Sequence, residues 1–122
     1  MNRLFRVAAF VAMLCFPMRI AAQYQVIELA DVQLAKSLGA TIQDSSGAPV
    51  PKAVVQEFSS DWKTVLRSGS TDTHGRFSFA PVLGRSIYFL QISTPGFDPP
   101  RFRLQVDAKH GFSLKLKLTI AT

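Results

Sequence analysis

A strict alternation of apolar and polar side chains runs through the C-terminal end of the chain. Every second residue from Phe112 to Ile120 is apolar, and the residues between them are serine, lysine or threonine. An α-helix repeats about every 3.6 residues, so an alternation of this length cannot form one helical face. Residues 102–106 alternate in the same way. Both runs predict β-strands with one buried face, and we expect them to pair as a final antiparallel hairpin.

Shorter strands of the same kind are predicted along the chain from Gly39 onward. Turn-forming residues at 44–47 and 71–75 separate them, and Asp72 is placed to cap its own turn. The predicted strands are residues 39–44, 53–58, 64–68, 76–79, 87–93, 102–106 and 112–120. This pattern predicts an all-β fold, a seven-stranded antiparallel two-sheet sandwich.

The alternation also predicts which side chains fill the core, with one conflict. A two-residue period from Ala53 and Val55 places Glu57 on the inward side of its strand. Either a β-bulge shifts the register after Val55, or Glu57 lies at the rim of a sheet, and we favour the bulge. The residues expected to be buried are Phe77, Phe79, Tyr88, Leu90, Leu104, Leu114 and Leu116.

Residues 1–22 have the pattern of a secretory signal peptide. Two arginines give a basic start, and an uncharged apolar run follows at 7–16. This run is shorter than the roughly 20 residues of a membrane-spanning helix, so we expect no transmembrane anchor after cleavage. Cleavage is expected after Ala22 or Gln23, which predicts a secreted or periplasmic protein. Residues 23–37 then form an N-terminal segment, for which a strand and a short helix both remain open.

The cysteine count and the net charge exclude two classes of site. Cys15 is the only cysteine and lies in the predicted signal peptide, so the released chain would have no disulfide and no cysteine metal ligand. The full chain carries 14 Lys and Arg against 8 Asp and Glu; without the three arginines of the predicted signal peptide, 11 remain and the excess is +3. An excess this small does not indicate a nucleic-acid partner.

Several segments from residue 39 onward resemble one known domain family. They read GATIQD at 39–44, GAPVPKAVV at 47–55 and TDTHGRFSF at 71–79, followed by Tyr88 and Gly96-Phe97. In these segments the chain is similar to the carboxypeptidase regulatory-like domain, which has the transthyretin-like (prealbumin-like) fold and is related to the Cna B-type domains. The resemblance covers residues 38–120 and implies a domain without catalytic residues. The family often occurs as an appendage of larger exported proteins, so the partner expected here is another exported or envelope protein.

The residues themselves show no arrangement typical of catalysis or metal binding. His74 and His110 both lie in predicted turns, and a metal site would need further ligands at matching spacing. The serines do not stand in a nucleophile-elbow pattern. Glu57 and Asp61 could be compared with a glycosidase pair, but two carboxylates near a strand end are usually solvated. We therefore expect a protein that is not an enzyme and has no metal and no cofactor.

Trp62 is the main candidate for ligand binding. It is the only tryptophan and lies in a predicted loop, where an indole ring can stack on a sugar. A sugar site would need a second aromatic residue, for which Phe58 and Phe97 are the candidates. The alternative is that Trp62 covers the end of the sandwich as an amphipathic side chain. The candidate ligand-binding residues are therefore Trp62 and Phe97, and the ligand considered is a glycan.

The predicted final hairpin would place four cations on one outward face, namely Arg101, Arg103, Lys115 and Lys117. Such a stripe could contact an anionic surface, or it could protect the sheet from edge-to-edge pairing. The first hypothesis for the function is an exported, non-catalytic accessory domain that interacts with another protein. The alternative is a carbohydrate-binding module built from the loop aromatics around Trp62.

Overall fold

The structure of the chain is a computed structural model that describes residues 25–121. Its regular elements are all β-strands, and the described residues contain no helix that could cross a membrane. The predicted signal peptide and both candidate cleavage positions lie outside the described residues. The strands are β1 (Ile27–Glu28), β2 (Gln33–Ala35), β3 (Gly39–Gln43), β4 (Val54–Phe58), β5 (Val65–Ser70), β6 (Arg76–Ser78), β7 (Ile87–Ser93), β8 (Phe97–Asp98), β9 (Pro100–Val106), β10 (Lys115–Lys117) and β11 (Thr119–Ile120).

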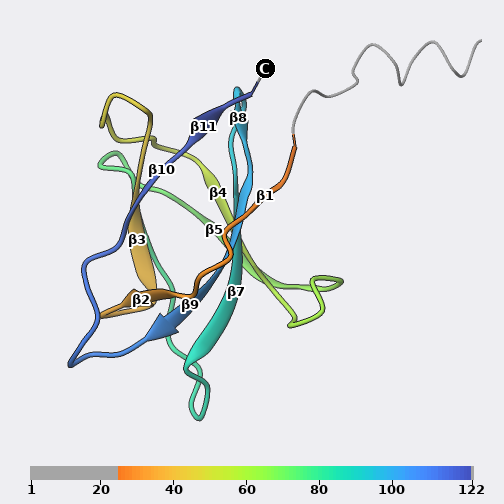
Figure 1. Ribbon diagram of the computed structural model, residues 1–122, viewed down its shortest axis with the longest axis vertical. Coiled ribbons are helices and arrows are strands. Elements are labelled where there is room, and N and C mark those ends of the chain that lie inside the picture. The colour runs from red at the N-terminus through yellow and green to blue at the C-terminus, as the bar shows by residue number, and fades with distance from the viewer. Residues whose placement is uncertain (1–24, 122) are drawn as a thin grey trace, which may run out of the picture.

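The strands form a larger and a smaller sheet on either side of one core (Figure 1). The larger sheet has the order β1-β9-β7-β4-β5, with β2 also paired to β9. The smaller sheet has the order β10-β3-β6, and β11 pairs with β8. The predicted all-β fold is confirmed, but the predicted arrangement of seven purely antiparallel strands is wrong. Eleven strands are described, and β1 and β2 run parallel to β9 while β10 runs parallel to β3.

The last two predicted strands do not form a hairpin, because they belong to different sheets. After β9 the chain crosses from the larger to the smaller sheet through residues 107–114. The crossing passes so close to β2 that a Cβ atom on Gly111 would lie 2.4 Å from the carbonyl carbon of Ala35. Only glycine fits at this position without moving the backbone. The crossing brings β10 alongside β3 in the same direction, which explains the parallel pair.

The N-terminal segment that the sequence left open forms two short strands and no helix. In β1, Ile27 lies opposite Pro100, and in β2, Ala35 lies opposite Val106. Just before β1, the backbone N–H of Gln25 donates a hydrogen bond to the Asp98 carboxylate at 3.0 Å. The two strands therefore cover the edge of the larger sheet that β9 would otherwise expose.

The register of β4 differs from both alternatives predicted for it. β4 pairs regularly with β7 along its whole length, so there is no bulge after Val55. The irregularity lies instead in β5, where Leu66 has no opposite residue on β4. Glu57 stays on the inward side and is only 1% exposed, rather than lying at an open rim. It is accommodated there because Arg67 and Arg85 each bind one of its carboxylate oxygens at 2.6 Å.

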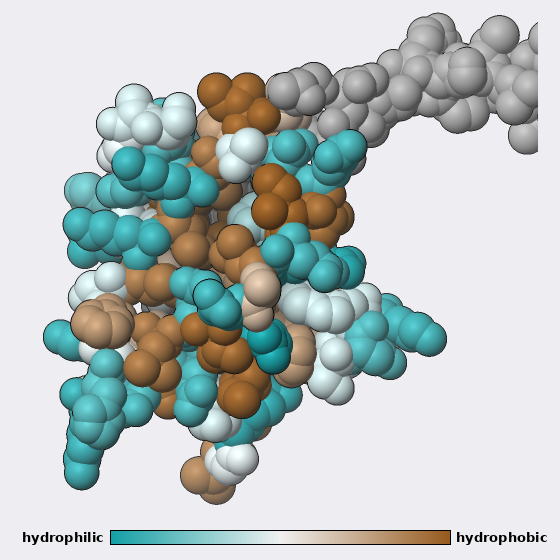
Figure 2. All heavy atoms as spheres, viewed as in Figure 1, coloured by the Kyte–Doolittle hydropathy of each residue, from teal (hydrophilic) through white to brown (hydrophobic). Residues whose placement is uncertain are grey.

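The core lies between the two sheets and follows the predicted alternation closely. Five of the seven residues predicted to be buried are buried, and Phe79 and Leu114 are partly buried against them. The prediction fails at the ends of the last run, where Phe112 is 69% and Ile120 is 58% exposed. The reason is that only β10 of this run belongs to the smaller sheet, after which the chain leaves to pair β11 with β8. Figure 2 shows apolar side chains gathered in the middle of one face, with hydrophilic ones around them.

Candidate binding surface around Trp62

Three aromatic rings and one guanidinium lie together on the outer face of the larger sheet. Phe58 on β4 and Phe89 on β7 are directly opposite each other, and Glu57, Tyr88 and Leu90 beside them face the core. Trp62 reaches them from the turn between β4 and β5, and Arg101 reaches them from β9. We call these four residues the Trp62 cluster. Side chains alternate across a strand, so the burial of Glu57 beside Phe58 explains why the cluster faces outward.

A polar turn holds Trp62 in place. The backbone of Trp62 is left-handed, with φ of 64°, which is uncommon for a residue other than glycine. The Asp61 carboxylate accepts hydrogen bonds from the Ser59 hydroxyl at 2.6 Å and from the Lys63 backbone N–H at 3.0 Å. These bonds, that of Ser59 foremost, hold the pKa of Asp61 below its ordinary value. The Trp62 N–H donates to the Ser59 carbonyl at 2.8 Å, so the turn is fixed on both sides of the indole.

The rings and the guanidinium pack closely but are not stacked flat. The Trp62 ring centre lies 5.5 Å from those of Phe58 and Phe89, with interplanar angles of 48° and 87°. The guanidinium carbon of Arg101 lies 4.7 Å from the Trp62 ring centre and 5.6 Å from that of Phe58. Arg101 Nε also donates to the Gln91 side-chain carbonyl at 2.7 Å. Contacts of these kinds contribute about 0.5–1.5 kcal/mol each, so together they favour this arrangement of the four side chains.

A hollow of about 340 Å³ borders the cluster. Its lining combines the Trp62 indole with the Glu28 carboxylate and with the side chains of Arg101 and Arg103. Arg103 Nη2 donates to the Ala30 carbonyl at 2.7 Å, which ties this side of the hollow to the segment between β1 and β2. The hollow therefore offers charged hydrogen-bonding groups of both signs beside an aromatic ring.

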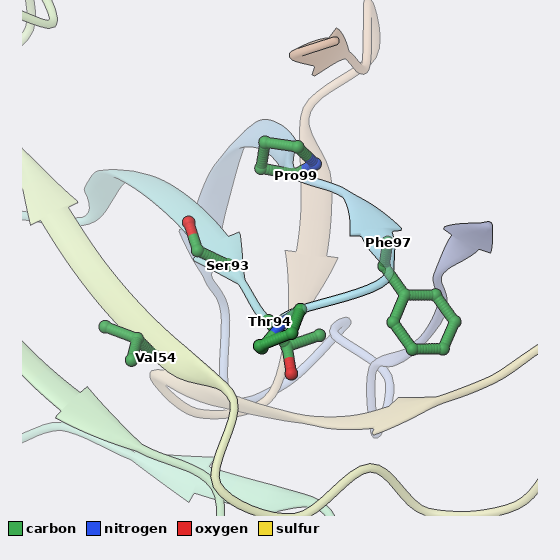
Figure 3. A pocket seen from close by; sticks show the side chains of 6 residues that line it. Val54, Ser93, Thr94, Phe97 and Pro99 are labelled. Atoms are coloured by element: carbon green, nitrogen blue, oxygen red, sulfur yellow. The ribbon is translucent and has the colours of Figure 1, made fainter. Parts of the chain in front are cut away.

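The structure does not bring Phe97 near Trp62. Phe97 lines a second, open hollow of about 370 Å³ together with Val54 and Pro99 (Figure 3). Val54 begins β4, whereas Trp62 lies beyond the other end of the same strand. Five residues of strand span about 13 Å or more, so one sugar ring cannot contact both aromatics. The second aromatic beside Trp62 is Phe58, the other candidate from the sequence, and Phe89 is the third.

The four cations predicted to form one stripe lie on two different surfaces. Arg101 and Arg103 are on the outer side of the larger sheet, whereas Lys115 and Lys117 are on the outer side of the smaller sheet. The premise of a common hairpin face is therefore wrong. β10 is an edge strand of the smaller sheet, and exposed lysines on an edge strand discourage pairing with another chain.

Phe89 was missed as a site residue, although its sequence position carried a signal. It is an aromatic residue at an outward position of a strand whose inward positions are Tyr88 and Leu90. An outward phenylalanine on a central strand is stabilised when another side chain shields its ring from water, and the sole tryptophan is large enough to do this. The sequence carries no comparable signal for Arg101, because its contact with the aromatic rings depends on β9 lying next to β7.

The remaining candidates are dispersed. His74 lies exposed in its turn, and His110 Nδ1 lies 3.2 Å from a carboxylate oxygen of Asp107 in another. Residues 25–121 contain no group of three or more His, Cys, Asp or Glu that could hold a metal ion. Glu57 points into the core while Asp61 lies in the exposed Trp62 turn, so these carboxylates do not form a pair across a cleft.

The fold and the surface together define an all-β domain with two facing sheets and an ordered aromatic cluster on its outer face. The chain belongs to the carboxypeptidase regulatory-like domain family, whose family model matches residues 37–119. The match confirms the resemblance inferred from the sequence motifs. The domain family is non-catalytic. A comparison with curated proteins finds no match.

Proposed function

We propose that the chain is an exported, non-catalytic accessory domain that binds another exported or envelope protein through the Trp62 cluster. The observation that supports this most is the presence of three aromatic rings and an arginine on the outer face of a sheet. The outer face of an antiparallel sandwich sheet is ordinarily polar. Tryptophan and arginine are the residues most enriched where protein interfaces gain their affinity.

The surroundings of the cluster also suit a protein partner. Val65 and Ile87 share the outward parity of Phe58 and Phe89 and are exposed. They extend the apolar area beyond the rings, and polar residues such as Gln91 and Arg103 lie around it, which is the usual anatomy of an interface. The turn fixes Trp62 in advance, so little side-chain freedom is lost on binding.

A glycan is the second candidate ligand, favoured by the hollow beside the indole. Glu28 and Arg103 could bind sugar hydroxyls there while Trp62 contacts the ring. Two features weaken this candidate. Arg101 lies over the Trp62 ring, and the Phe58 ring is tilted by 48° from it, so the two aromatics do not form a flat platform.

Replacing Trp62 with alanine is expected to lower affinity for the protein partner by about 2 kcal/mol or more, roughly thirtyfold, as for an interface hot spot. The partner would be captured from envelope extract with an immobilised domain, identified, purified and titrated. Phe112→Ala is the matched control, because Phe112 is an exposed aromatic outside the cluster. Equal affinity of the wild type and Trp62→Ala would contradict the proposal.

A glycan panel separates the two candidates. Binding of a free glycan by the wild type and not by Trp62→Ala, without any protein partner, would favour the carbohydrate-binding function. Retention of the glycan by Phe112→Ala would show that the loss is specific to the cluster.

Export is expected to leave a shorter chain that begins at Gln23 or Tyr24. The basis is the basic start, the apolar run at 7–16 and the small residue at Ala22. Intact-mass measurement of protein recovered from an exporting host would give the first residue directly. Recovery of only the full-length chain from the cytosol would contradict export while leaving the binding proposal open.

A further inference from the structure

A fully exposed leucine stands at the tip of the connection between β6 and β7. Leu83 is the most exposed of the large apolar side chains that the structure describes, and Val82 beside it is also exposed. Figure 1 shows this connection projecting beyond the end of the larger sheet. Val82 and Leu83 together form a small apolar patch at the outermost point of this connection.

The tip is held rigidly in this exposed position. The Arg85 N–H donates to the Val82 carbonyl at 3.0 Å, and Gly84 adopts the left-handed φ of 83° that closes the turn. From below, the hydroxyl of buried Tyr88 accepts from the Val82 N–H at 2.9 Å and donates to the Arg85 carbonyl at 2.9 Å. The turn cannot fold Leu83 back onto the domain without breaking these bonds, so its exposure is built into the fold.

Cations lie at the same end of the domain as the tip. Arg85 is part of the turn itself, and the hydrogen bond from Val106 N–H to the Ser86 carbonyl joins the turn to the end of β9. The turn after β9 carries exposed Lys109. In the same turn the Asp107 backbone N–H donates to the Ala35 carbonyl, and this bond brings exposed Lys36, the next residue after Ala35, to the same end of the domain.

The acidic groups at this end are already engaged. Glu57 is buried between Arg67 and Arg85, so this trio carries one excess positive charge. Asp107 accepts the backbone N–H groups of Lys109 and His110 and lies beside the His110 ring. The turn and the segments bonded to it therefore carry a net positive charge beside the apolar tip.

We propose that this end of the domain binds anionic lipid bilayers, with Leu83 and Val82 inserted among the headgroups and Lys36 and Lys109 against the phosphates. A lipid surface is favoured over a protein because the tip is convex and narrow. A fluid bilayer admits such a tip anywhere, whereas a rigid protein would need a matching socket. Apolar insertion combined with cation attraction is the usual basis of reversible binding to a membrane surface. The inference concerns a different surface from the Trp62 cluster and does not rest on the proposed function.

The first test is binding to vesicles of phosphatidylcholine and phosphatidylglycerol mixed two to one. The wild type is expected to co-sediment at about 0.1 M salt and much less at about 1 M, where the Debye length falls from about 10 Å to about 3 Å. Leu83→Asp should reduce the partition coefficient between vesicles and water about ten- to a hundredfold, because this is the ratio that corresponds to the transfer of one leucine side chain out of water. Ile120→Ala is the matched control, because Ile120 is an exposed apolar residue at the other end of the domain and should leave binding unchanged.

A second test locates the contact independently of the residues before 25. With Cys15 replaced by serine, an environment-sensitive dye is attached at Leu83→Cys or at Ile120→Cys. The dye at position 83 should shift to the blue on addition of the vesicles, and the dye at position 120 should not. The proposal is overturned if the wild type does not bind, if Leu83→Asp binds equally, or if both dyes shift alike. Failure to bind lipid, combined with burial of the dye at position 83 by a purified protein, would assign the tip to a protein partner instead.

Discussion

Replacing Glu57 with glutamine is expected to destabilise the domain by about 3 kcal/mol, the lower end of the range for breaking a buried ion pair. Glu57 is 1% exposed, and its two oxygens accept from Arg67 Nε and Arg85 Nη2, both at 2.6 Å. An amide would leave both guanidiniums without a counter-charge. The two arginines are partly exposed and can recover some hydration, which places the loss at the low end. Chemical denaturation of the purified domain measures the change.

The control for this prediction is the triple replacement Glu57→Leu, Arg67→Met and Arg85→Met. Removal of a whole buried ionic group in favour of apolar side chains is often neutral or stabilising. The guanidinium carbons of Arg67 and Arg85 lie 4.8 Å and 4.9 Å from the ring centres of Phe79 and Tyr88, where a methionine side chain can pack instead. The triple variant should therefore be more stable than Glu57→Gln. If it were less stable, the three side chains would contribute through packing that methionine cannot reproduce, and the account of Glu57 would be wrong.

The network at Glu57 shows where sequence reasoning stopped. The alternation correctly places Glu57 on the inward side. A buried carboxylate needs a partner, and the local sequence offers none, so the sequence favours a bulge that would turn Glu57 outward. The partners could not be found from local pattern, because Arg85 lies in a loop 28 residues away. Only the order of the strands brings β5 and the loop before β7 to the same end of β4.

Strand positions were predicted well for a physical reason, and strand pairing was not. Alternation depends only on which face of a strand is buried, so it placed Leu116 inward and Lys117 outward correctly. It does not depend on the neighbouring strand or on its direction. The parallel pair of β10 and β3 arises from the crossing at Gly111, where the chain passes against Ala35.

The candidate site could be predicted in part. Trp62 was identified because a lone tryptophan in a polar loop is conspicuous, and Phe58 was already considered beside it. Phe89 and Arg101 join the cluster only because β7 lies next to both β4 and β9. Phe97 was excluded from it by the same topology, since it follows β7 at the far end of the sheet.

Replacing Phe102 with alanine is expected to destabilise the domain by about 3–5 kcal/mol, the range for truncating a buried phenylalanine. Phe102 is 1% exposed on the inward side of β9, directly opposite Leu90 on β7. The loss combines the transfer of the ring to water with the cavity left between the sheets. β9 pairs regularly with β7, and β7 pairs regularly with β4, so these strands have little freedom to move into the cavity.

Two further replacements test whether burial determines the size of this effect. Phe79→Ala should cost less than Phe102→Ala, because Phe79 lies only partly buried at the margin of the core. Lys117→Ala should change the free energy of unfolding by less than about 0.5 kcal/mol, as is usual for an exposed position. Denaturation midpoints of the three variants in one buffer give the order. If Lys117→Ala were the most damaging, the inward and outward faces of the strands would have to be exchanged, and the placement of the core between the two sheets would be wrong.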